Sequence, residues 1–260
     1  VIDPPVTGPS ESATLELTPI GTYETGIFDA SAAEIVHSYG DRLFVVNAQA
    51  GTVEALDAAN PSVPTKMFDI SSAGVANSLA VREDGLGVIA FEDEDKTAPG
   101  RLVFFDADFV PDGDASPILG EVTVGALPDM VAISEDGTYA VVANEGEPAD
   151  DFSVDPEGSI GVVTLPAEKA APAQDAVRTA GFDAFEGETL PADVRVFGPD
   201  VAAPDQGETA LEANRVSRNL EPEYVAIADG TAYAALQEAN AVAVVDLASA
   251  TVTDIWPLGF

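Results

Sequence analysis

Apolar and polar residues alternate in short blocks along most of the chain. Four stretches follow the same order: an apolar run, a tight turn with glycine, a second apolar run, a polar loop and a third apolar run. They begin at Ala33, Val75, Leu127 and Leu220. Short apolar runs bounded by turn residues are typical of β-strands. A parallel α/β sheet would need amphipathic helical segments between the strands, and the sequence has none, so the pattern predicts an all-β chain.

The tight turns give the repeat its register. Their glycines are Gly40, Gly85, Gly137 and Gly230. Glycine is favoured there because it adopts a positive φ without steric cost. A repeat of roughly 40–50 residues with three or four short strands is the signature of a β-propeller blade. We therefore predict a β-propeller with YVTN/WD40-like blades, four of them in this segment, as part of a larger propeller of about seven blades.

The repeats also define the expected domain organisation. Residues 1–14 are interpreted as a flexible leader and residues 15–260 as the propeller segment. The expected blades lie near 31–70, 75–124, 127–165 and 220–260. Residues 166–219 lack the pattern and are interpreted as an insertion, with a degenerate blade as the alternative.

Both ends of the chain add to this interpretation. The stretch "ATLELTPIGTYETG" at 13–26 is expected to supply one or two further strands. The last residues fall within a predicted strand. We therefore expect the remainder of the propeller to lie C-terminal to Phe260.

Several polar residues are candidate ligand-binding positions. Seven residues after each turn glycine, the second strand is expected to end at equivalent polar side chains, namely Asn47, Glu92, Asn144 and Gln237. Arg215 and Arg218 precede "LEPEY" and could meet an anionic ligand near these strand ends. Ion pairing of the two arginines with Glu221 and Glu223 is the alternative.

The strongly negative charge of the chain excludes some classes of binding partner. The chain carries 46 acidic and 10 basic residues, a formal charge of −36, yet 46% of its residues are hydrophobic. The chain is therefore expected to be globular and to repel nucleic acid and anionic membranes. Many acids with few lysines indicate a halophilic protein, because salt screens such a surface. The sequence has no cysteine and no apolar run long enough to span a membrane.

The position of the acids suggests a metal site. In an antiparallel hairpin the start of the first strand and the end of the second share one rim. Six candidate ligands fall there: Asp129, Glu145, Glu147, Glu221, Glu223 and Glu238. Oxygen ligands without cysteine or histidine suit hard cations, and we expect Ca²⁺. Solvation of a salt-adapted surface is the alternative explanation.

Other chemistry has little support in the sequence. His37, the single histidine, is expected to be a core or channel residue and not a catalytic one. No phosphate-binding P-loop motif and no G-x-S-x-G nucleophile motif is present. No catalytic residue is assigned.

Several phrases in combination resemble one known family. They include "TPIGTYETGIFDASAAEIV" from Thr18, "LPDMVAISEDG" from Leu127, "VANEGEP" from Val142, "VDPEGSI" from Val154 and "NLEPEYVAI" from Asn219. Together they resemble the choice-of-anchor I domain family over residues 15–260, a family of secreted or cell-surface β-propellers similar to a mesenchyme-specific cell-surface glycoprotein. The resemblance implies an extracellular or cell-surface location.

Two functions remain open at this point. The first is a non-catalytic propeller that binds calcium and a cell-surface protein or polymer through its acidic rim. The second, implied by phosphatase-like and phytase-like labels in the family, is a calcium-dependent phosphoesterase acting on a small phosphoester. The acidic motifs fit both, whereas no nucleophile or lysine-rich phosphate clamp is recognisable.

Overall fold

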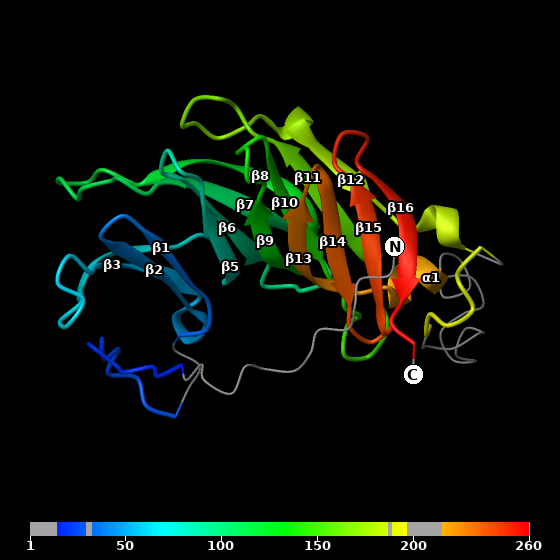
Figure 1. Ribbon diagram of the computed structural model, residues 1–260, viewed down its shortest axis with the longest axis horizontal. Helices are drawn as coiled ribbons and strands as arrows, with labels where there is room; N and C mark the ends of the chain where they lie inside the picture. The colour runs from blue at the N-terminus through cyan, green and yellow to red at the C-terminus, as the bar shows by residue number, and fades with distance from the viewer. Residues whose placement is uncertain (1–14, 30–32, 187–188, 197–214, 260) are drawn as a thin grey trace.

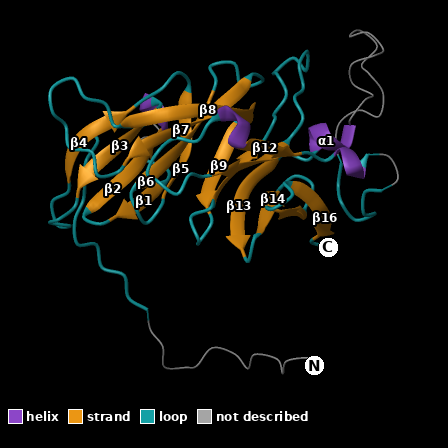
Figure 2. Cartoon of the chain, turned by 90° about the horizontal axis from the view of Figure 1, so that it is seen from above, coloured by secondary structure: helices purple, strands orange, loops and turns teal. Residues whose placement is uncertain are grey.

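The strands form four antiparallel sheets in the computed structural model, which describes residues 15–29, 33–186, 189–196 and 215–259. Each sheet contains four strands in chain order, so each strand pairs with the one before it. Figure 1 shows the sheets side by side, from the blue N-terminal sheet to the orange and red C-terminal sheet, and Figure 2 shows the same strands from above. This is the arrangement of propeller blades, and the prediction of a β-propeller fold is confirmed.

We number the sheets blade 1 to blade 4. Blade 1 contains β1 (Val36–Tyr39), β2 (Arg42–Asn47), β3 (Thr52–Asp57) and β4 (Thr65–Ile70). Blade 2 contains β5 (Val75–Val81), β6 (Leu86–Glu92), β7 (Pro99–Asp106) and β8 (Ile118–Ala126). Blade 3 contains β9 (Pro128–Ile133), β10 (Tyr139–Asn144), β11 (Ser159–Thr164) and β12 (Val177–Ala180). Blade 4 contains β13 (Pro222–Ala228), β14 (Thr231–Leu236), β15 (Ala241–Asp246) and β16 (Thr251–Pro257).

The helical elements are short. They are the 3₁₀ turns η1 (Ala48–Ala50), η2 (Gln174–Ala176) and η3 (Asp183–Phe185), and the α-helix α1 (Arg215–Asn219). None of the helices in the described ranges is long and apolar enough to cross a membrane.

The core consists of the interfaces between neighbouring blades. Because side chains alternate along a strand, blades 2 and 3 each present one apolar face to the blade before and another to the blade after. Between blades 1 and 2, the rings of Phe44 and Phe105 lie 5.1 Å apart. Small residues such as Ala232, Ala234 and Ala243 let blade 4 approach blade 3. The first strands of successive blades contact one another, which places these strands nearest the axis.

The hairpins are as predicted, but positions counted from the turn glycines are not structurally equivalent. Gly40 is the first of two turn residues, because Tyr39 pairs with Arg42. Gly230 is the second, because Ala228 pairs with Thr231. A shift of one residue exchanges the two faces of a strand. The residues seven positions after the glycines all lie at the end of a second strand or just beyond it, but not on one face.

The predicted blade boundaries also differ from the structure in one place. β12, the fourth strand of blade 3, pairs Val177 with Val163 and Ala180 with Ile160. It lies within residues 166–219, which we expected to be an insertion. Residues 15–29, in contrast, contain no strand, although strands were expected there. The rest of the predicted leader, residues 1–14, lies outside the described part.

Residues 15–29 instead pack on the first blade. A Cβ atom at Gly21 would lie 2.0 Å from the carbonyl oxygen of Pro61, so the two backbones are in close contact. The hydroxyl of Tyr23 donates a hydrogen bond to Glu54, which is 6% exposed and also accepts one from Asn47. Burial alone would raise the pKa of Glu54, but these bonds and the nearby Lys66 together lower it. The N-terminal segment therefore contacts blade 1 at Pro61 and Glu54, while most of its side chains are exposed.

Three arginines, Arg42, Arg82 and Arg178, connect each blade to the next; we call them the inter-blade arginines. Arg42 donates to the carbonyls of Ala107 and Phe109, both at 2.7 Å. Arg178 donates to the carbonyls of Leu247 and Ala248, at 2.9 and 2.7 Å. The acceptors are backbone oxygens in the turn after the third strand of the following blade. Bonds from a charged donor are the stronger class of hydrogen bond.

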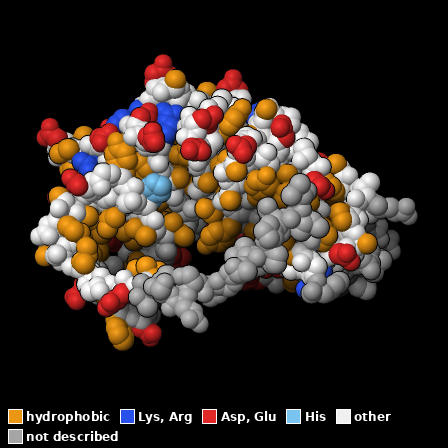
Figure 3. Space-filling view, in the orientation of Figure 1, with side chains coloured by type: hydrophobic (Ala, Val, Ile, Leu, Met, Phe, Trp, Pro, Cys, Tyr) orange, Lys and Arg blue, Asp and Glu red, His pale blue; other side chains and the backbone are white. Residues whose placement is uncertain are grey.

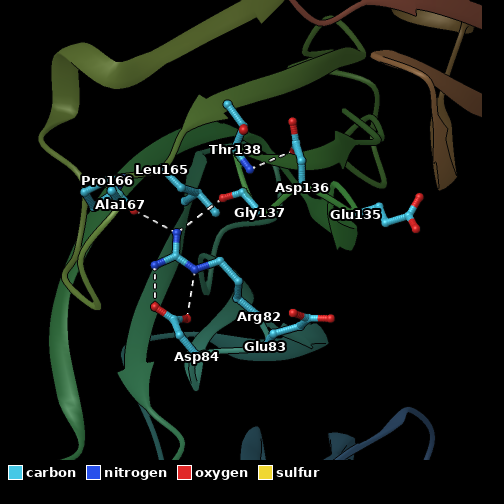
Figure 4. A pocket seen from close by; sticks show the side chains of 10 residues that line it. All are labelled: Arg82, Glu83, Asp84, Glu135, Asp136, Gly137, Thr138, Leu165, Pro166 and Ala167. Carbon is cyan, nitrogen blue, oxygen red and sulfur yellow. Dashed lines mark hydrogen bonds and ion pairs between the residues drawn. The ribbon is translucent and has the colours of Figure 1, made fainter.

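Arg82 makes the same kind of connection between blades 2 and 3 (Figure 4). It donates to the carbonyl of Pro166 at 2.7 Å and to that of Gly137 at 3.3 Å, while Asp84 accepts from the other side of its guanidinium at 2.8 Å. The pocket around it has a volume of about 520 Å³ and lies at the turns between the first and second strands. This turn side is the rim opposite to the predicted acidic rim.

Candidate functional site

The acidic rim is formed by the starts of the first strands and the ends of the second strands, as predicted. Val75 pairs with Glu92 in blade 2, and Pro128 pairs with Asn144 in blade 3. The amide of Glu145 donates to the carbonyl of Leu127 at 2.9 Å. The hairpins therefore bring Asp129 and Glu145 to the same end of blade 3.

Carboxylates from all four blades interact near the axis. Burial, together with the negative charges of Glu223, Glu92 and Glu34, raises the pKa of Asp129 to about 6. These three neighbours belong to blades 4, 2 and 1 or their flanking residues. Because Asp129 lies on an innermost strand, its charge is close to acids on several blades at once.

The strongest effect is between blades 3 and 4. Burial raises the pKa of Glu145 most, and with the negative charges of Glu147, Asp129, Glu223 and Glu221 it reaches about 8. Burial and the charges of Glu238 and Glu147 raise the pKa of Glu221 to about 7 and also raise that of Glu223. The six predicted metal ligands therefore lie in one electrostatically coupled cluster, which we call the rim cluster.

Little positive charge compensates the rim cluster. Lys96 binds Glu147 at 2.9 Å and Asp150 at 3.7 Å, at its outer edge. Burial raises the pKa of Asp155, and only Arg218 opposes this effect. A shallow pocket of about 630 Å³ adjoins Lys96. Its lining consists of Glu92, Glu94, Asp95, Lys96, Thr97, Ala149, Asp150 and Asp151.

The sequence analysis did not predict the contacts that position the segment leading to Glu221. Glu186 accepts hydrogen bonds from the backbone amides of Val216 and Ser217 at 3.1 and 2.8 Å, and from the Ser217 hydroxyl at 2.8 Å. These bonds hold the start of α1, which leads directly into Leu220 and the rim. A Cβ atom at Gly158 would lie only 2.2 Å from the carbonyl oxygen of Leu220, so the loop of blade 3 is in close contact there. No local motif indicates a contact made across 30 residues.

The other predicted ligand-binding residues are not equivalent to one another. Asn47 and Asn144 are buried and donate to Glu54 at 2.9 Å and to Ser159 at 3.2 Å within their own blades. Glu92 is half-buried and accepts from Asn77 at 3.3 Å, whereas Gln237 is exposed. The two asparagines therefore have structural roles in the blades.

The remaining predicted positions lie outside the rim cluster. Arg215, in α1, donates to the carbonyl of Val196 at 3.2 Å. His37 lies on β1 opposite Phe44 in the strand register, and burial lowers its pKa. A neutral, half-buried imidazole agrees with the expectation of a core or channel residue.

The rim cluster fits Ca²⁺ by chemistry more than by present geometry. Its side chains offer only carboxylate oxygens, the ligands that calcium prefers. Among the described residues, however, no three histidine, cysteine or acidic side chains already converge as a metal-binding group. A cation would have to draw the carboxylates together. Figure 3 shows how red acidic side chains outnumber blue basic ones on the visible face.

Comparison with solved structures agrees with the fold. Hydrazine synthase of Kuenenia stuttgartiensis is 16% identical with a TM-score of 0.54, covering 90% of this chain and 52% of that chain. A functionally unknown protein from Desulfotomaculum acetoxidans DSM 771 is 11% identical with a TM-score of 0.52, covering 88% and 58%. This chain thus spans about half the length of these proteins. At such low identity the likeness shows the fold alone.

The family is shown by a different comparison. No curated protein matches the chain. The model of the choice-of-anchor I domain matches residues 34–260, which include all four blades and every residue of the rim cluster. The chain therefore belongs to the choice-of-anchor I domain family.

Proposed function

We propose that this protein is a secreted or cell-surface β-propeller whose rim cluster binds calcium and, through it, a cell-surface protein or polymer. Family membership supports the location, because the family is named for its surface-anchored domain. The observation that carries the calcium proposal is the set of partly buried carboxylates on facing blades with raised pKa values. Such groups repel one another unless a proton or a cation neutralises them.

Calcium would act by joining blades 3 and 4. Glu145 and Glu147 follow the second strand of blade 3, whereas Glu221 and Glu223 begin blade 4. A cation shared between these pairs would stabilise the folded state, because the unfolded chain cannot assemble the cluster. An exposed coordination position on the same ion could accept an oxygen of an acidic or hydroxylated partner.

Titration calorimetry tests this proposal. The protein is titrated with calcium chloride at about 2 M sodium chloride, so that screening by added ions stays constant. We expect a binding heat and a rise in the melting temperature. In the Glu145→Gln and Glu223→Gln double variant the calcium affinity should fall at least about tenfold, because two of the carboxylate ligands are lost.

A matched control uses the opposite rim. The double variant Glu83→Gln and Glu135→Gln removes the same charge from the turns of blades 2 and 3. It should leave calcium affinity unchanged. Absence of both a heat and a melting shift in the unmodified protein would show that the rim acids serve solvation alone.

One further measurement distinguishes a calcium-dependent phosphoesterase from a non-catalytic calcium-binding protein. If the rim is catalytic, the protein hydrolyses a generic phosphomonoester with calcium, and a chelator abolishes the reaction. Lys96 is the lysine beside the rim pocket, and it is already bound to Glu147 and Asp150. We therefore expect calcium binding without hydrolysis.

A further inference from the structure

The turns between the first and second strands differ in what lies over their glycines. A Cβ atom at Gly85 of blade 2 would lie 2.8 Å from the hydroxyl oxygen of Tyr39 in blade 1. One at Gly137 of blade 3 would lie 2.8 Å from Cδ of Arg82 in blade 2. One at Gly230 of blade 4 would have no described atom within 4 Å. Side chains of the preceding blade therefore cover the turn glycines of blades 2 and 3, whereas that of blade 4 faces open space.

This open space belongs to a cavity of about 300 Å³ between the turns of blades 3 and 4, which we call the 3–4 cavity. Three acids line it, Glu135 and Asp136 from blade 3 and Asp229 from blade 4. Tyr139 and Ile227 supply apolar walls and pack against the core between the two blades. Of the residues that line the cavity in the described part of the chain, none is basic.

The cavity lies where the preceding interface holds an arginine. The turn sequences are "REDG" from Arg82 in blade 2 and "SEDG" from Ser134 in blade 3. In both turns the glycine amide donates to the carbonyl of the first residue, at 2.9 and 2.8 Å, so Arg82 and Ser134 hold the same position. The short side chain of Ser134 donates to Asp136 at 2.7 Å within its own turn. The serine therefore leaves empty the space that an arginine fills one blade earlier.

Arg178, the third inter-blade arginine, does not line this space. It lies on β12, the outermost strand of blade 3, whereas Arg42 and Arg82 belong to the hairpins of the first and second strands. From β12 it reaches the carbonyls of Leu247 and Ala248. Every lysine and arginine of the chain lies in the described ranges, and none of them lines the 3–4 cavity. A cationic side chain that fills the cavity must therefore come from another molecule.

We propose that the 3–4 cavity binds the guanidinium group of an arginine in a basic segment of a partner protein. Arg82 shows the chemistry: Asp84 accepts two hydrogen bonds from its guanidinium, both at 2.8 Å, and Pro166 accepts a third at 2.7 Å (Figure 4). Asp136 is the counterpart of Asp84 in the 3–4 cavity, and Asp229 adds a second carboxylate. The ring of Tyr139 is a surface on which a guanidinium can stack.

Charge and size agree with this partner. A chain with a charge of −36 attracts basic segments and speeds their association. A volume of about 300 Å³ is at the lower end for ligand sites, which suits one side chain and not a large ligand. The 3–4 cavity lies on the turn side, the rim opposite to the rim cluster. The proposal therefore does not depend on calcium binding and can fail without it.

Titration of the ¹⁵N-labelled protein by NMR tests the site. The ligand is the blocked peptide acetyl-Gly-Arg-Gly-amide at about 1 M sodium chloride, where exposed charges are screened beyond about 3 Å. We expect saturable shifts of the amides of Thr138 and Gly230. The same peptide with neutral citrulline, or with lysine, which lacks the planar fork, should bind at least about fivefold more weakly. Absence of shifts at these amides, or equal affinity for the three peptides, would overturn the proposal.

Variants of the turns provide the matched test. Ser134→Arg supplies a guanidinium from the chain itself and should weaken binding of the arginine peptide at least about tenfold. Asp229→Asn keeps the size of the cavity and should weaken binding severalfold. Asp41→Asn removes the same charge beside the turn glycine of blade 1 and should have no effect. An equal loss in Asp229→Asn and Asp41→Asn would show general charge attraction and overturn the proposal, even if Ser134→Arg does not fold.

Free arginine distinguishes the source of the guanidinium. Its own carboxylate would be repelled by Asp136 and Asp229, so it should bind severalfold more weakly than the blocked peptide. Free arginine that binds as tightly as the peptide, or more tightly, would indicate a site for a small molecule. That result would overturn the assignment to a protein partner.

Discussion

At the scale of single residues, the rim carboxylates determine how the protein responds to pH. Their pKa values in the folded state are about 8 for Glu145, about 7 for Glu221 and about 6 for Asp129. In the unfolded chain the pKa values of the same side chains would be about 4. The folded state therefore binds more protons over this interval, and the free energy of unfolding decreases as pH rises.

This predicts the direction in which stability changes with pH when a chelator keeps the protein free of calcium. The stabilisation is fully present below about pH 4 and is lost as pH rises through the interval from about 6 to about 8. Melting temperatures should fall between about pH 5 and about pH 9, and Glu145→Gln should flatten this dependence. Glu135→Gln, on the opposite rim, should leave it unchanged. A melting temperature that rises over this interval would contradict the assignment.

Single residues also show how far the sequence could lead. The rim acids were predictable, because antiparallel pairing alone brings Asp129 and Glu145 to one end of a blade. The predicted equivalence of Asn47 and Gln237 was wrong, because the two turns place glycine at different positions. Glu186 could not be predicted either, since its hydrogen bonds to α1 depend on tertiary structure.

At the scale of elements, the hairpins of the blades were the most predictable part. Each combines two apolar runs with a turn glycine of positive φ, and these signals are local. β12 was missed because it has four residues in a stretch rich in alanine and proline. Its pairing with β11 makes it a strand, and its contact with blade 4 through Arg178 gives it a further role.

The contact of Arg178 leads to a prediction for this element. Arg178→Lys keeps the charge but loses the fork that reaches Leu247 and Ala248 together. The free energy of unfolding should fall by about 1 kcal/mol, because the site is partly exposed. Denaturant titration measures this. The neighbouring variant Thr179→Ser should change it by less than about 0.5 kcal/mol. Equal stability of the lysine variant would show that the contact contributes nothing.

At the scale of the whole molecule, net charge is the dominant property. The net charge is −36, so the acidic side chains repel one another. This repulsion extends over a Debye length of about 10 Å at 0.1 M salt and only about 3 Å at 1 M. We expect the melting temperature to rise steadily with sodium chloride. Replacing Asp41, Glu83 and Glu135 by their amides should weaken this dependence, since less charge remains to be screened. A melting temperature independent of salt would remove the argument for salt adaptation.

The inter-blade arginines have a consequence for how this sequence can change over time. Their acceptors are carbonyl oxygens, as at Ala107, Pro166 and Leu247, and every amino acid supplies one. The receiving turns can therefore exchange side chains freely, provided the backbone path is kept. Surface acidity can accumulate in those turns by drift without breaking the contacts between blades. Only the three donors are constrained, so a lineage could become strongly acidic while its architecture stayed the same.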